Sequence, residues 1–150
     1  MRVTASILIQ RPISEVFSFV STPGYLPAWV AGVAAVDGPA PPEQGIGETL
    51  VVQGIPSLGL VWSTWEVTSY EPPRTLALRC LDDRRAIEAR WTLEGCCSGA
   101  TRISVEADLT AVSFFPPASV DLKELGTRQL QADLEILRRH LEVDALEDTR

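Results

Sequence analysis

The chain has few of the side chains that build metal sites and disulfide frameworks. It contains three cysteines and a single histidine. Cys96 and Cys97 are adjacent and Cys80 stands alone, a spacing that makes neither a disulfide framework nor a CxxC metal clip. One histidine without a cysteine pair excludes a His/Cys zinc site. We therefore expect reduced structural thiols, no metal and no cofactor.

Basic charge and long apolar runs are also scarce. The 13 Lys and Arg residues face 20 Asp and Glu residues, which gives a formal net charge of −7. Nucleic-acid binding needs a basic footprint, so this charge argues against a nucleic-acid partner. No stretch approaches the ~18 apolar residues needed to span a bilayer, and the N-terminus lacks the features of a signal peptide. We expect a cytoplasmic protein without stable membrane insertion.

Hydrophobic residues make up 45% of the 150 positions, a proportion typical of one compact globular domain. We take residues 1–150 as that domain. The last residues, 144–150, lack an apolar partner, and we expect them to fray.

The most informative segment, residues 60–70, is rich in β-branched and aromatic side chains, which predicts a long strand. The pair Pro72-Pro73 ends it, and a second strand-like stretch follows at 75–81, so the two form a hairpin. Trp62 and Trp65 are three residues apart and lie on opposite faces of a regular strand. At least one indole should therefore face the interior.

The other segments predict an α+β protein with a mostly antiparallel sheet. Short connections leave no room for a crossover helix, which a parallel sheet would need. Helical spacing of leucines predicts one long amphipathic helix over 119–143, roughly 36 Å in length. The remaining expected elements are strands at 3–10, 33–37, 47–53, 85–94 and 100–112, and short helices at 13–21 and 25–31.

These elements predict a cavity. A curved antiparallel sheet of six or seven strands, wrapped around a long C-terminal helix and closed at one end by two short helices, cannot contact the helix everywhere. An apolar space should remain between the two layers.

Several short sequence segments, together with the order of the predicted elements, resemble one known group. They are residues 9–20, Trp29, residues 66–74 and residues 99–103. The chain is similar over nearly its whole length to the START and polyketide cyclase superfamily (SRPBCC), with the helix-grip fold of the birch pollen allergen family. This resemblance implies a helix-grip fold with an internal pocket. It implies no single reaction, because the group includes lipid carriers, hormone receptors, aromatases and dehydratases.

Alternation along the strands predicts which side chains face that pocket. Trp62 and Tyr70 are too large to be comfortable on an exposed face, and a bulge in their strand would reconcile them with an inward Trp65. Phe17 is expected to pack in the core. The ligand-binding residues that we predict are Trp29, Val61, Ser63, Trp65, Val67, Leu78, Cys80, Ile87, Trp91, Ile103, Val105, Phe114 and Gln129.

Candidates for catalysis are few. His140 has the best pKa for proton transfer near neutral pH, but it lies near the end of the last helix, where we expect a structural or surface role. Glu66 has the opposite parity to Trp65, so it should point outward and pair with Arg79 or Arg90 across the sheet. A serine such as Ser63 is a poor nucleophile without a base. The sequence contains no clear catalytic constellation.

Three functions therefore remain open. The first is binding of a hydrophobic small molecule, such as a lipid, acyl chain or polyketide. The second is catalysis by a polyketide cyclase, aromatase or dehydratase, which an inward arginine or carboxylate with a partner would place first. The third is a protein-interaction module that uses the sheet edge or the Phe114-Phe115 loop and has a filled cavity. A monomer and a homodimer are both compatible with the sequence.

Overall fold

The computed structural model of the protein describes residues 2–30, 33–38, 45–54, 62–81, 85–96, 99–112 and 122–148. At 85–87, 109–112, 122 and 144–148 it describes the backbone alone.

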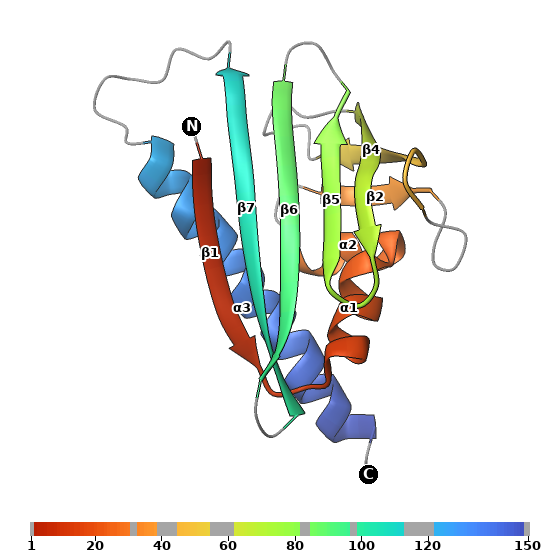
Figure 1. The fold of residues 1–150 in the computed structure, drawn as a ribbon, viewed down its shortest axis with the longest axis vertical. Helices are drawn as coiled ribbons and strands as arrows, with labels where there is room; N and C mark the ends of the chain where they lie inside the picture. The colour runs from red at the N-terminus through yellow and green to blue at the C-terminus, as the bar shows by residue number, and fades with distance from the viewer. Residues whose placement is uncertain are drawn as a thin grey trace.

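One curled antiparallel sheet forms the body of the described structure (Figure 1). Its strand order is β1-β7-β6-β5-β4-β3-β2, so β2 to β7 form a meander and β1 adds to its β7 edge. Short turns permit only antiparallel neighbours, as at residues 72–74 between β4 and β5. The strands are β1 (Arg2–Ile9), β2 (Val33–Asp37), β3 (Thr49–Gly54), β4 (Trp62–Glu71), β5 (Thr75–Cys80), β6 (Arg85–Cys96) and β7 (Ala100–Val112).

Short helices follow β1, and one long helix ends the described chain. Helix α1 (Ile13–Ser21) begins after the extended Pro12. A 3-10 turn, η1 (Pro23–Tyr25), leads into α2 (Leu26–Trp29). Helix α3 (Leu122–Asp148) runs along the sheet beside β1 (Figure 1). It extends beyond the predicted end at Val143, because the segment Asp144–Asp148 contains neither glycine nor proline.

The contact between α3 and β1 is close because of a glycine inside the helix. A Cβ atom at Gly126 would lie 3.2 Å from Cγ1 of Val3. The missing side chain lets the helix backbone approach the strand. Further along α3, Leu134 and Leu137 are fully buried in the main hydrophobic core.

The predicted bulge lies in β4. Val67 pairs with Leu78, but Ser69 pairs with the next residue of β5, Ala77, so Thr68 is the extra residue. This shift places Tyr70 opposite Leu76 on the core side.

The bulge reconciles Tyr70 with an inward Trp65, but the same expectation for Trp62 is wrong. The ring of Tyr70 contacts the ring of Phe17, with centroids 5.7 Å apart, and Phe17 is buried in the core as predicted. Trp62 lies before the bulge and remains 62% exposed.

The inward side chains predicted on β5 and β7 are buried where they are described, although Ala77 of the opposite parity on β5 is buried as well. Leu76, Leu78 and Cys80 are buried on β5, and Ile103 and Val105 are buried on β7. The long C-terminal helix, the short helices after β1 and the curled sheet together form the predicted helix-grip fold, in the α+β class.

Candidate functional site

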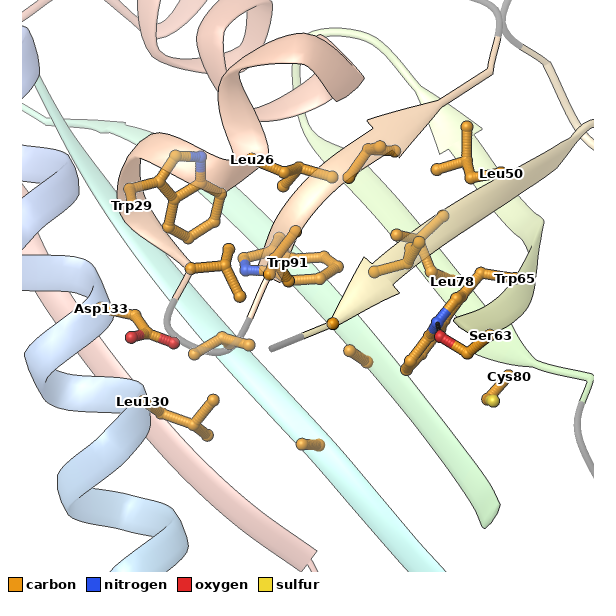
Figure 2. Close-up of a pocket in the computed structure, with 18 of the residues that line it drawn as sticks. Leu26, Trp29, Leu50, Ser63, Trp65, Leu78, Cys80, Trp91, Leu130 and Asp133 are labelled. Atoms are coloured by element: carbon orange, nitrogen blue, oxygen red, sulfur yellow. Dashed lines mark hydrogen bonds between the residues drawn. The ribbon is translucent and has the colours of Figure 1, made fainter. Parts of the chain in front are cut away.

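An apolar cavity of about 270 Å³ lies between the concave face of the sheet and the helices α2 and α3 (Figure 2). Its walls come from segments that are distant in the sequence. The middle of the sheet contributes Ser63, Trp65, Leu78, Cys80, Ala89 and Trp91. The curled end of the sheet and the segment before it contribute Val30, Val33, Val36, Leu50, Val52 and Gly54. The remaining described residues of the wall are Leu26, Trp29, Val105, Ala107, Leu130, Asp133 and Leu134.

Three tryptophans give this wall most of its aromatic surface. The rings of Trp29, from α2, and Trp91, from β6, meet edge to face, with centroids 6.3 Å apart and an interplanar angle of 78°. This geometry is favourable for aromatic pairs. Trp65 lies on β4, and its indole Nε1–H donates a hydrogen bond to Oγ of Ser63 at 2.9 Å. The two residues are neighbours on one face of the strand, and the bond fixes the indole in the wall.

The wall contains one carboxylate among its described residues. Asp133 lies on α3 with only 7% of its surface exposed, and Oδ1 accepts a hydrogen bond from Nε2 of Gln129 at 2.9 Å. Figure 2 shows the carboxylate extending from the helix toward the cavity, between Trp29 and Leu130. A buried carboxylate needs hydrogen-bonding partners because its desolvation is costly. Gln129, one helical turn earlier, supplies such a partner.

The structure brings together seven of the predicted ligand-binding residues around the cavity. They are Trp29, Ser63, Trp65, Leu78, Cys80, Trp91 and Val105.

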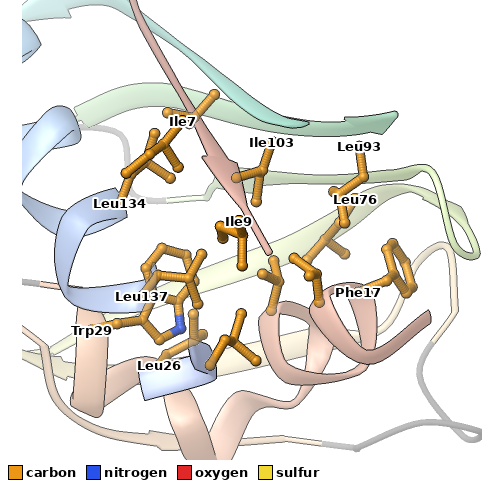
Figure 3. Close-up of a cluster of buried hydrophobic side chains, with 14 of the residues drawn as sticks. Ile7, Ile9, Phe17, Leu26, Trp29, Leu76, Leu93, Ile103, Leu134 and Leu137 are labelled. Atoms are coloured by element: carbon orange, nitrogen blue, oxygen red, sulfur yellow. The ribbon is translucent and has the colours of Figure 1, made fainter. Parts of the chain in front are cut away.

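Three other predicted residues lie elsewhere. Val67 and Ile103 are fully buried in the solid core next to the cavity, where Figure 3 shows Ile103 close to Leu93 and Ile9. Gln129 is exposed on α3 and reaches the site only through its bond to Asp133. Val61 and Phe114 lie outside the described residues, as does the side chain of Ile87.

Sequence reasoning missed Asp133, although a signal for it exists. Asp133 follows Leu130 by three positions and precedes Leu137 by four. Residues at these spacings share one face of a helix, so the apolar stripe of leucines already contained this carboxylate. A charged residue between the leucines of an amphipathic helix is usually solvated, and the spacing of this one shows otherwise.

The other polar candidates lie outside the described wall of the cavity. Nη2 of Arg79 is 2.8 Å from Oε2 of Glu66 on the neighbouring strand, which confirms the predicted cross-strand pair. The ring of His140 stacks on Phe19 of α1, with centroids 6.1 Å apart, in line with the structural role expected of it.

Comparison with known proteins places the chain in a family. A family model described as polyketide cyclase / dehydrase and lipid transport matches residues 1–142. No curated protein matches the chain significantly. None of the described helices is long and apolar enough to cross a bilayer.

Solved structures share the fold at low sequence identity. Protein BH1534 of Bacillus halodurans has a TM-score of 0.73 and 19% identity, over 95% of this chain and 97% of its own. The Aha1 dimer of Colwellia psychrerythraea has a TM-score of 0.69 and 14% identity, over 95% and 97% of the two chains. The di-domain ARO/CYC protein BexL of the BE-7585A biosynthetic pathway has a TM-score of 0.72 and 15% identity, and the match covers 95% of this chain and 46% of BexL. With the family model matched from the first strand into the last helix, the chain belongs to the polyketide cyclase / dehydrase and lipid transport family.

Proposed function

We propose that the protein binds a hydrophobic small molecule, of lipid, acyl or polyketide type, in the cavity between the sheet and α3. The observation that carries this proposal is the cavity itself, about 270 Å³ of space walled by three tryptophans and by aliphatic side chains. Ligand sites are typically concave and apolar with a small number of placed polar groups, here Ser63 and Asp133. A filled interior, which the protein-interaction hypothesis required, does not agree with this cavity.

Filling the cavity tests the proposal. Ala89 lies on β6 opposite Ala107 of β7, and both small side chains face the cavity. In the Ala89→Phe variant the ring occupies this space, and we expect binding of 1-nonanol, measured by isothermal titration calorimetry, to weaken at least tenfold. The matched control is Ala35→Phe, the same substitution at an exposed position of β2. Equal binding by the two variants would contradict the proposal.

Native mass spectrometry of the purified protein adds a test without substitution. A hydrophobic molecule that co-purifies with the wild-type chain and with Ala35→Phe, but not with Ala89→Phe, identifies the natural ligand. A molecule retained equally by all three chains would be bound outside the cavity.

A second candidate function is catalysis on a bound polyketide, and Asp133 is the observation that favours it. An inward carboxylate with a partner is the feature that would place catalysis first, and Asp133 with Gln129 has that form. A carboxylate in an apolar site can act as a general base toward an acidic C–H next to a carbonyl. The described wall offers no second acid or base besides the thiol of Cys80, so binding, which both functions require, remains the first proposal.

Deuterium exchange tests the catalytic candidate directly. Nonane-2,4-dione in D₂O exchanges its central methylene protons when a base removes them. If Asp133 is a general base, the wild-type chain raises this exchange above the buffer rate and Asp133→Asn returns it to that rate. If the dione binds but the wild-type chain does not raise the exchange rate, Asp133 is not a general base, and only the binding function remains.

A further inference from the structure

A hydroxyl with a fixed orientation lies in the part of the cavity wall that β4 contributes. Ser63 and Trp65 are two residues apart, so they project from the same face of the strand, and both line the cavity. The indole Nε1–H of Trp65 donates a hydrogen bond to Oγ of Ser63 at 2.9 Å. Figure 2 shows this pair near Cys80, on the opposite side of the cavity from Asp133 of α3. The hydroxyl of Ser63 is thus held at a defined place in the wall.

The bond from Trp65 determines how Ser63 can bind a ligand. A hydroxyl has one O–H donor and two acceptor lone pairs, whereas an indole can only donate. The oxygen of Ser63 therefore turns a lone pair toward Trp65, and its own proton points away from the indole. Val52, the partner of Ser63 on β3, has an apolar side chain, and among the described residues no second hydrogen bond of this hydroxyl is found. The O–H is left as a donor for a group that enters the cavity.

Accepting one hydrogen bond also changes the strength of the next. Hydrogen bonds in a chain polarise one another, so an oxygen that accepts from an N–H becomes a better donor through its own proton. A ligand that accepts a hydrogen bond therefore gains more from Ser63 than a ligand that donates one. The best acceptor for this wall is a neutral carbonyl, because one hydroxyl offsets little of the cost of burying a charged carboxylate.

We propose that Ser63 donates a hydrogen bond to a carbonyl oxygen of the ligand, and that the protein therefore favours apolar ketones and esters over hydrocarbons of the same shape. This inference rests on the proposed binding function and narrows its ligand class. The carbonyl lies at the β4 wall beside Trp65, and the apolar body extends past Trp91 toward Trp29 (Figure 2).

Two probes isolate the carbonyl from the rest of the ligand. Butyrophenone and butylbenzene share a phenyl ring and a carbon chain of the same length, and they differ only in the carbonyl oxygen that replaces two hydrogens. Both need the same apolar space, so a general change in the cavity affects both. A difference between them therefore reports the bond to Ser63.

The first experiment measures binding of both probes by isothermal titration calorimetry, below their solubility limits. In Ser63→Ala we expect the affinity for butyrophenone to fall about 2- to 10-fold relative to that for butylbenzene, the effect of one neutral hydrogen bond. Ser63→Thr keeps a hydroxyl and should retain the wild-type ratio. The matched control is Thr64→Val, which removes a hydroxyl from the next residue of β4, outside the described wall, and should also leave the ratio unchanged.

Infrared spectroscopy tests the bond in the wild-type chain without a substitution. The carbonyl stretch of a ketone moves to lower frequency when its oxygen accepts a hydrogen bond. We expect bound butyrophenone to absorb at lower frequency than butyrophenone in hexane, and the band to return toward the hexane value in Ser63→Ala. A purely structural role of Ser63 would not move this band.

The outcomes separate the inference from the binding function. If Ser63→Ala keeps the wild-type ratio of affinities, or if the bound carbonyl absorbs at its hexane frequency, the carbonyl site is refuted, and binding of butylbenzene shows that the binding function stands. A lowered band that persists in Ser63→Ala would mean that another group holds the carbonyl, which also refutes the inference. If neither probe binds, the binding function fails and the inference fails with it. The wild-type band decides even if a variant does not fold.

Discussion

Ser63 and Trp65 stabilise each other inside the cavity wall. The indole Nε1–H of Trp65 donates to Oγ of Ser63, and both groups are only partly buried. Ser63→Ala removes the acceptor, and we expect the free energy of unfolding to fall by about 1 kcal/mol, the usual contribution of such a bond. Urea denaturation measures this change. Ser63→Thr keeps a hydroxyl and is the control, and an unchanged midpoint in Ser63→Ala would show that the bond adds nothing to stability.

The ionisation of Tyr70 makes the stability of the fold depend on pH. Burial raises the pKa of its phenol above the ordinary value of 10.0, because the charged phenolate is poorly solvated there. The neutral form therefore stabilises the fold below pH 10, and this contribution is lost as the pH rises through the raised pKa.

Both the raised pKa of Tyr70 and the loss of stability at high pH can be measured. The chain has two tyrosines, so Tyr25→Phe leaves Tyr70 as the only phenol, and its ultraviolet absorbance titration should have a midpoint above pH 10. Tyr70→Phe should lose less stability than the wild-type chain between pH 10 and 11. A midpoint for Tyr70 below pH 10 would contradict this reading.

Single residues differ in how far the sequence predicts them. Trp65 and Trp91 could be placed inward because strand alternation is a local property of the chain. Asp133 could not be assigned by its residue type, since a charged side chain between leucines is usually solvated. Its spacing from Leu130 and Leu137 was the only signal, and only the packed helix shows that this face borders a cavity.

At the scale of elements, α3 has faces of very different burial. Leu137 is fully buried, whereas Leu125 on the same helix is 52% exposed. We expect Leu137→Ala to lower the free energy of unfolding by about 2–5 kcal/mol, because it leaves a hole in a packed core. Leu125→Ala is the matched control and should change stability by less than about 0.5 kcal/mol. Denaturant unfolding of the two variants checks the difference, and similar losses would mean that α3 is rotated from its described position.

The helices and strands could be predicted where the pattern of neighbouring residues determines them. The bulge in β4 followed from the parity of Tyr70, whereas Trp62, the other large side chain of that parity, stays exposed. The wall formed by β2 and β3 was missed, because it depends on how far the sheet curls. An irregularity of pairing between Val33 and Ala35 lets both Val33 and Val36 line the cavity. Strict alternation would have placed them on opposite faces.

At the scale of the whole molecule, the cavity exists only when the complete fold is formed. Its walls extend from Leu26 near the start of the chain to Leu134 in the last helix. A ligand of the cavity therefore binds the folded state and not the unfolded chain. At 100 times its Kd, such a ligand adds about 2.7 kcal/mol to the free energy of unfolding.

Thermal unfolding with and without 1-nonanol measures this gain. The transition should move up as one cooperative step in the wild-type chain and in Ala35→Phe. Ala89→Phe should show little or no shift. A shift of equal size in the cavity-filled variant would point to binding at the surface.

Helix α3 is exposed at its start and buried further along, and this difference affects which part of the helix opens first. From Leu134 onward it is anchored by Leu134, Leu137 and Leu141, whereas Lys123, Glu124 and Leu125 at its start are exposed. Local opening requires less free energy where fewer apolar contacts must separate. Amide protons should therefore exchange with solvent sooner in the first turns of α3 than around Leu137. Fraying at that end would open a path to the cavity beside Leu130 for a ligand, while the rest of the protein stays folded.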